Sequence, residues 1–173
     1  MGADLYIKNL DRDNQITGFR TNIDSGYFRD CYNSHGLLSL IHSNSKTRLS
    51  WNYILKKEEW LINNSDDGLE LNLKGSIELK DMLTEIREEL SNKPFIIRDG
   101  GEMGMIMSDI IKFILNEISE ENGEDIKIVE GAPPEGFTTL TDDGIKDFFQ
   151  HLDKFISFLQ LAIQLESNVI LSC

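Results

Sequence analysis

The sequence predicts a mainly helical α+β fold, in which three to four helices pack with a small β-sheet in one globular domain covering residues 1–173. Three long segments have apolar residues at helical spacing or around most of the helix circumference. Several short segments show the alternation or the brief apolar runs that are typical of strands. A chain of 173 residues can bury one continuous core without disulfide or metal staples.

The clearest predicted helix covers residues 142–166. Thr141 or Asp142 can cap its first amides, and the acidic residues there suit the positive end of the helix dipole. At about 100° per residue its apolar side chains fall within about 120°, which predicts a side that faces the core. These side chains are Ile145, Phe148, Phe149, Leu152, Phe155, Ile156, Leu159 and Ile163.

A second apolar strip on this helix consists of Phe158, Leu161 and Leu165, and a simple surface helix would not need it. Two explanations stay open. The apolar tail at 169–171 can cover the strip within the monomer, or a partner can cover it, including a second copy in a homodimer. The second explanation makes these three side chains candidate binding residues.

Two further helices are expected at 76–92 and 102–120. The first begins at Ser76, ends before Pro94 and has one apolar face, so we expect it at the surface. That face consists of Leu79, Met82, Leu83, Ile86 and Leu90. The second is apolar around most of its circumference, which favours a central helix against which the 142–166 helix packs.

The strand signals are shorter and predict a small sheet. Ala3, Leu5 and Ile7 alternate with polar residues. Leu69, Leu71 and Leu73 do the same, and brief apolar runs occur at 95–97 and 126–129.

The chain is strongly acidic, with 30 Asp and Glu against 17 Lys and Arg and a formal net charge of −13. A phosphate backbone would be repelled, so we expect no direct binding to nucleic acid. The acidity can keep the protein soluble, attract a basic protein partner, or cover the basic groove of a nucleic-acid-binding protein.

The two cysteines, Cys31 and Cys173, lack the spacing of a disulfide framework, and the N-terminus lacks the regions of a signal peptide. No apolar run approaches the roughly 20 residues that cross a bilayer. We therefore expect a cytoplasmic protein without a membrane partner.

The stretch SGYFRDCYNSHG at 25–36 is the densest group of aromatic and polar side chains, and it can be a site or only packing. If the stretch is a helix capped by Asp24 or Ser25, its aromatic, cysteine and histidine side chains fall on one face. That face consists of Tyr27, Phe28, Cys31, His35, Leu38 and His42. Arg29, Asp30 and Asn33 then tie the helix to the N-terminal strand. As a recognition surface, its candidate binding residues are Tyr27, Arg29, Asp30, Tyr32, Asn33 and His35.

Catalytic and metal-binding patterns are incomplete in this sequence. Cys31 and His35 have the spacing of two metal ligands, but no CxxC or HxxxH pair supplies the others, and a nucleophile pair would lack an identifiable orienting acid. A calcium-loop pattern begins at Asn63 but ends on Lys74, where a glutamate is required. We expect no catalytic residue, metal or cofactor.

The opening MGADLY, the stretch GYFRDCYN at 26–33 and the pair Ser50-Trp51 resemble a group of small uncharacterised bacterial and bacteriophage proteins. The resemblance covers about the first 50 residues and implies an accessory role in a phage or mobile element. In that group the position of Cys31 is often serine, which argues against a catalytic thiol here.

Two functions of different classes follow. The first is a non-enzymatic, acidic accessory protein that binds another protein, such as a basic host factor that it antagonises. The alternative is a small hydrolase or metal-assisted enzyme centred on Cys31, His35 and Asp30.

Overall fold

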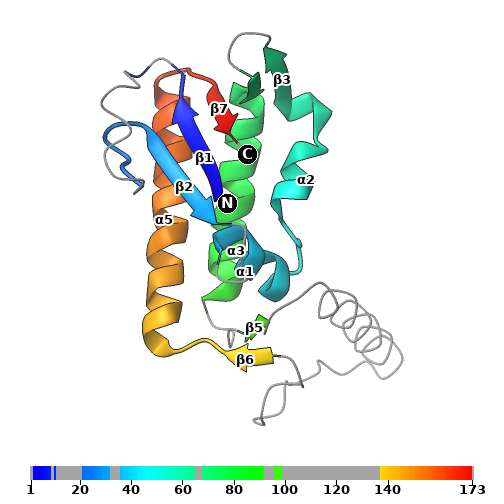
Figure 1. Ribbon diagram of the computed structural model, residues 1–173, viewed down its shortest axis with the longest axis vertical. Helices are drawn as coiled ribbons and strands as arrows, with labels where there is room; N and C mark the ends of the chain where they lie inside the picture. The colour runs from blue at the N-terminus through cyan, green and yellow to red at the C-terminus, as the bar shows by residue number, and fades with distance from the viewer. Residues whose placement is uncertain are drawn as a thin grey trace.

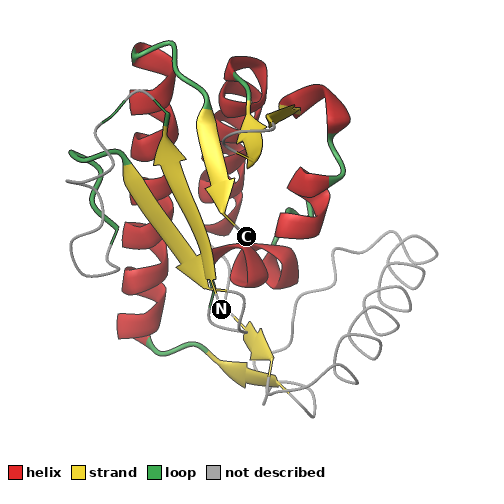
Figure 2. Cartoon of the chain, turned by 45° about the horizontal axis from the view of Figure 1, so that its top comes forward, coloured by secondary structure: helices red, strands yellow, loops and turns green. Residues whose placement is uncertain are grey.

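A computed structural model describes residues 2–8, 10, 21–31, 36–64, 68–91, 96–98 and 137–172. Within these residues the fold is α+β. Four α-helices accompany a five-stranded antiparallel sheet with the strand order β2-β1-β7-β4-β3 (Figure 1). The two longest helices lie against one face of this sheet (Figures 1 and 2).

The predicted N-terminal strand is confirmed as β1 (Gly2–Ile7). Ala3, Leu5 and Ile7 are completely buried, as their alternation predicts. Strand β1 pairs antiparallel with β2 (Tyr27–Cys31) on one side and with β7 (Val169–Ser172) on the other.

The C-terminal tail therefore forms part of the sheet, where β7 lies between β1 and β4. Val169 and Leu171 stand opposite inward residues of β1 and are buried, so the apolar tail does fold back within the monomer. Beyond β7 lie β4 (Gly68–Leu71) and the outermost strand, β3 (Leu61–Asn64). Leu73, predicted as a strand residue, instead begins the next helix.

The helix predicted at 142–166 is confirmed as α5 (Asp142–Gln164), and the Thr141 hydroxyl caps it by accepting a hydrogen bond from the Gly144 N–H. The helix predicted at 76–92 is α3 (Leu73–Leu90). Its cap is Asn72 rather than Ser76, so it begins earlier than the sequence suggested. It packs directly on α5 rather than lying only at the surface, because its apolar face meets that of α5 beneath the sheet.

The described part of the segment at 25–36, which is residues 25–31 and 36, does not form the predicted helix. Residues Tyr27–Cys31 are strand β2, and the preceding Gly26 has a φ of 68°, in the left-handed region that favours glycine. The backbones of Tyr27 and Asn22 exchange two hydrogen bonds of 2.9 Å, which close a tight turn before the strand. This turn and the pairing with β1 replace the helical hydrogen bonds.

Strand alternation also divides the predicted helical face. Phe28 and Asp30 lie opposite inward residues of β1 and face the helices. Tyr27, Arg29 and Cys31 belong to the other face, and Cys31 is exposed rather than packed inward.

The remaining described elements flank the sheet. Helix α1 (Leu37–Asn44) follows β2, and α2 (Trp51–Leu55) and the short 3-10 helix η2 (Glu58–Trp60) lead into β3. A separate two-stranded sheet pairs β5 (Ile96–Arg98) with β6 (Phe137–Thr139).

Two predicted elements, the helix at 102–120 and the strand at 126–129, lie outside the described residues. Among the described elements, α3 is the main helical neighbour of α5. None of the helices in the described ranges is long and apolar enough to span a bilayer.

The centre of the core is a cluster of three phenylalanines between sheet and helices. Phe28 stacks on Phe155 with ring centroids 4.3 Å apart and lies 5.9 Å from Phe158. All three are completely buried. Phe158 is therefore a core residue and is not available as the surface binding residue that the strip on α5 suggested.

Candidate functional site

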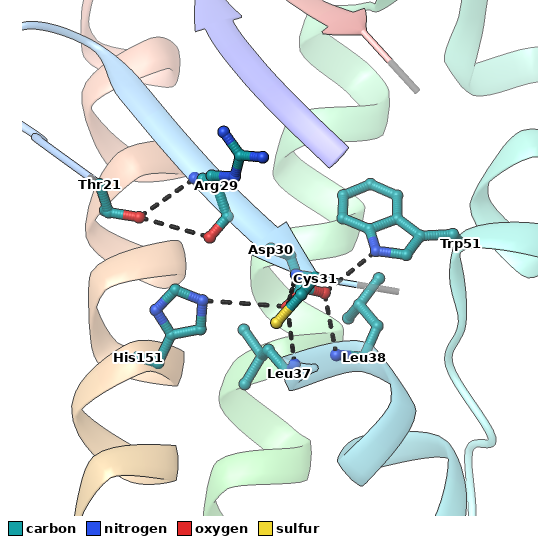
Figure 3. A network of polar contacts seen from close by, with 8 residues as sticks. All are labelled: Thr21, Arg29, Asp30, Cys31, Leu37, Leu38, Trp51 and His151. Carbon is teal, nitrogen blue, oxygen red and sulfur yellow. Dashed lines mark hydrogen bonds and ion pairs between the residues drawn. The ribbon is translucent and has the colours of Figure 1, made fainter. Parts of the chain in front are cut away.

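The carboxylate of Asp30 is the centre of a buried polar cluster. Asp30 is 2% exposed and accepts four hydrogen bonds from three parts of the chain (Figure 3). The donors are the backbone N–H groups of Cys31 (2.9 Å), Leu37 (2.7 Å) and Leu38 (3.2 Å) and the indole N–H of Trp51 (3.0 Å). An ionised carboxylate accepts about four hydrogen bonds, so its capacity is filled.

Two of these bonds cap helix α1. Its N-cap residue, Gly36, has no side chain, and its first turn contains no acidic residue. Asp30 supplies from the neighbouring strand the acceptor and the negative charge that a capping aspartate normally supplies. Because Trp51 begins α2, one carboxylate joins β2, α1 and α2.

His151 on α5 is the ionisable side chain that faces Asp30. Its Nε2 lies 3.9 Å from Oδ1 of Asp30 (Figure 3), and its ring stacks on Phe28 at 4.8 Å. Burial lowers the pKa of His151; the charge of Asp30 and a hydrogen bond to the Arg29 backbone oppose the shift, whereas Lys154 adds to it. The separation of 3.9 Å is too long for a hydrogen bond, so the two side chains do not form a His–Asp dyad.

Cys31 lies beside this cluster and is exposed. Partial desolvation raises the pKa of its thiol, and the negative charge of Asp30 raises it further. The neutral thiol is therefore favoured at neutral pH, which is the opposite of what a nucleophilic cysteine requires.

The other face of β1 and β2 holds a second polar group. The hydroxyl of Tyr27 donates a hydrogen bond of 2.5 Å to Oδ1 of Asp4, and a guanidinium nitrogen of Arg29 lies 3.5 Å from the same oxygen. Burial and the bond to Asp4 raise the pKa of Tyr27 to about 12, so this phenol stays protonated as a donor. The ring of Tyr6 lies 5.2 Å from that of Tyr27.

These residues come from the two quoted motifs. The MGADLY and GYFRD stretches are paired strands in which Asp4 stands opposite Arg29 and Tyr6 opposite Tyr27. The side chains of Arg29 and Asp4 remain 32% and 21% exposed, so part of this group is accessible to another molecule.

An open pocket of about 440 Å³ lies between α1 and α5. Leu37, Leu40 and Phe148 form part of its apolar lining, and His151 and Lys154 contribute polar atoms. The pocket therefore borders the Asp30 cluster, but Asp30 itself is not among its lining residues.

The predicted site residues thus divide into separate groups. Tyr27 and Arg29 share one face of the sheet, whereas Asp30 lies on the opposite face. Tyr32, Asn33 and His35 lie outside the described residues. On α5, Leu161 is half-buried against the core and Leu165 is 44% exposed.

Sequence reasoning did not assign roles to His151 or Trp51 in this cluster. The available signal for His151 was its position within the apolar stripe of α5, three residues after Phe148 and four before Phe155. For Trp51 there was only its occurrence in the Ser50-Trp51 pair, which gives no partner.

No group of three or more His, Cys, Asp or Glu side chains within the described ranges is arranged to hold a metal ion. No protein-family model, curated protein or solved structure matches this chain.

Proposed function

We propose that this protein is a non-enzymatic accessory protein that acts by binding another protein. The main support is the filled hydrogen-bonding capacity of Asp30. Its bonds to α1, α2 and its own strand explain the burial of the carboxylate without a catalytic role.

The alternative of a small hydrolase loses support from the chemistry of Cys31. Its thiol has a raised pKa, and Asp30, the acid assigned to the same centre, is committed to backbone and indole donors. A cysteine nucleophile needs a lowered pKa or an adjacent base.

The proposed recognition surface consists of Arg29, Asp4 and Tyr6 on the sheet face that is opposite the helices. Tyrosine and arginine are enriched at the energetic centres of protein interfaces. Here Asp4 holds Arg29 and Tyr27 in position, which reduces the side-chain entropy lost on binding.

The net charge of −13 favours a basic partner. The resemblance to small phage and bacterial proteins extends this proposal to an accessory of a phage or mobile element that antagonises a host factor in the cytoplasm. Repulsion between acidic groups and phosphates argues that the partner is a protein rather than a nucleic acid. A homodimer is the competing assembly. For the architecture, we retain the proposal of a mainly helical domain.

The test is affinity capture from a lysate of the organism that encodes the protein, using the parent chain, Arg29→Ala and Tyr6→Ala. Arg87→Ala is the matched control, because Arg87 also pairs with an aspartate but lies on α3. We expect a basic protein that both sheet-face variants lose and the control retains.

The captured partner is then purified and its affinity measured between about 50 and 500 mM salt, over which the Debye length shrinks roughly threefold. We expect the affinity to fall as salt rises. An acidic partner, an affinity that is independent of salt, or equal binding by Arg29→Ala and the parent would refute this surface. Turnover of a substrate that depends on Cys31 would instead support the hydrolase.

A further inference from the structure

Strand β3 lies at an edge of the five-stranded sheet (Figures 1 and 2). It pairs with β4 on one side, with Leu61 opposite Leu71 and Asn63 opposite Leu69. An edge strand presents backbone donors and acceptors to which another extended chain can bind.

The phase of the ladder shows which backbone groups point outward. The N–H of Asn72 donates to the C=O of Trp60 at 2.8 Å, and these residues continue the β3–β4 register. Hydrogen-bonded and non-hydrogen-bonded pairs alternate in an antiparallel ladder, so Leu61 and Asn63 direct their backbone groups away from β4. The N–H of Leu61 already donates a hydrogen bond to the C=O of Glu58. The outward groups for an added strand are thus the C=O of Leu61 and both backbone groups of Asn63.

The opposite edge of the sheet, β2, is closed by the protein's own chain. The hydroxyl of Thr21 accepts a hydrogen bond from the N–H of Arg29 at 3.1 Å and lies 3.4 Å from its C=O, to which it donates. Asn22 pairs with Tyr27 beside it. The outer edge of β2 is therefore already paired with the protein's own chain at two positions.

Strand β3 is short, with four residues, but two other common forms of edge protection are absent from its sequence. Its residues, LINN, include no charged side chain and no proline. Ile62 is 43% exposed, and Asn63, the residue that carries the outward donor and acceptor, is also exposed. This combination is typical of sheets that bind peptides by strand addition.

We propose that the edge of β3 binds an extended, basic segment of a partner protein as an added strand. The net charge of −13 favours lysine or arginine in that segment. This preference comes from the whole chain, because Lys56 and Lys57 balance Glu58 and Glu59 directly before β3, and Lys57 lies 3.7 Å from the Glu59 carboxylate. Ile62 provides an apolar contact for an alternate side chain of the segment. Pairing of β3 with β3 of a second copy would bring two acidic chains together and is disfavoured.

This inference rests on the proposed function only in that the partner is a protein. The β3 residues Ile62 and Asn63 are separate from Asp4, Tyr6 and Arg29, so the β3 edge and the sheet face are tested by different variants. Loss of binding in Arg29→Ala alone addresses the sheet face, whereas loss in an Asn63 variant alone addresses this edge.

The probe is an eight-residue peptide of alternating valine and lysine, and its affinity is measured by calorimetry with the full chain. Asn63→Pro removes the outward N–H, and proline is tolerated on an edge strand where that N–H faces solvent. Asn63→Ala is the matched control that retains the donor. Ile62→Lys is a second variant, which keeps every backbone donor but repels the basic probe.

We expect binding by the parent and Asn63→Ala, at least tenfold weaker binding by Asn63→Pro and Ile62→Lys, and lower affinity at higher salt. Should Asn63→Pro fail to fold, the result for Ile62→Lys decides. Absence of binding by the parent up to millimolar probe, or equal binding by parent and variants, overturns the proposal. A dimer of the parent that Asn63→Pro converts to a monomer, detected by light scattering, also overturns it, because a second copy then occupies the edge.

Discussion

Replacement of Asp30 by alanine tests whether the polar cluster is structural. The substitution removes the acceptor of the N–H groups of Leu37 and Leu38 and of the indole N–H of Trp51, all in buried hydrogen bonds. The fourth donor, the N–H of Cys31, is only partly buried. The cost of Asp30→Ala is therefore the cost of leaving these donors without a partner.

Each buried donor left unsatisfied costs about 1–3 kcal/mol, which gives roughly 3–9 kcal/mol for three such donors. The lower part of this range is the more realistic, because water can enter the space that the carboxylate leaves. We expect the free energy of unfolding to fall by about 4 kcal/mol, a large part of the roughly 5–15 kcal/mol of a typical domain. Asp30→Asn keeps one acceptor oxygen but directs an NH₂ group at the donors, so we expect about 2 kcal/mol.

The assay is urea denaturation followed by circular dichroism, with linear extrapolation to water. Asp153→Ala is the control, because Asp153 is an exposed partner of Arg87 and such pairs contribute less than about 1 kcal/mol. If Asp30→Ala unfolds within about 0.5 kcal/mol of the parent, the carboxylate does not hold these elements together. Its burial would then need a functional explanation, and the case against an enzyme would fail.

Three further predictions concern the core and its ionisation. Because the pKa of His151 is lowered in the folded protein, the unfolded chain binds more protons as pH falls through about 6.5, so the free energy of unfolding decreases below about pH 7. His151→Gln should remove this part of the slope, at most about 1.4 kcal/mol per pH unit, and identical slopes in denaturant titrations would contradict the assignment. Gly75→Ala should lower the melting temperature although alanine favours helices, because the added Cβ would lie 2.7 Å from Cβ of Trp60; a higher melting temperature would disprove the close contact. Phe155→Ala should cost about 3–5 kcal/mol in urea denaturation by opening a cavity against Phe28, and a loss below about 1 kcal/mol would mean that this stack is not core.

Helix α5 and strand β1 could be predicted from the sequence because their signals are local. The stripe that includes Leu152 and Phe155 repeats at helical spacing, and the cap Thr141 stands directly before the helix. The alternation through Leu5 belongs to a strand buried on one face. In both elements the intrinsic periodicity and the tertiary environment agree.

Strand β2 could not be predicted because its stabilising partner is distant in sequence. The apolar positions 27, 28 and 31 fit a helical face as well as a short strand, and periodicity alone does not separate the two. Pairing with β1 decides between them. Gly26 was the local signal that was missed, since its positive φ allows the turn that precedes the strand.

The same limitation explains the incomplete prediction of the site. Asp30 was identified as a candidate, but its partners are contributed by the start of α1, by Trp51 and by His151 on α5. Spacing within 25–36 holds no information about these contacts. An aspartate in a strand is recognisable as the cap of a following helix only when the strand and the helix are placed together.

The alternation of β2 divides the residues of the GYFRD stretch between the two faces of the sheet. Phe28 and Asp30 face the helices, where one fills the core and the other caps α1, so both are explained by stability. Tyr27 and Arg29 face the other way and meet Asp4 of the MGADLY stretch. A structural role for Asp30 therefore leaves the function of Arg29 unconstrained. Because successive residues of one strand lie on opposite faces, an Asp30 variant should lose stability, whereas an Arg29 variant should lose binding of the proposed partner while the fold persists.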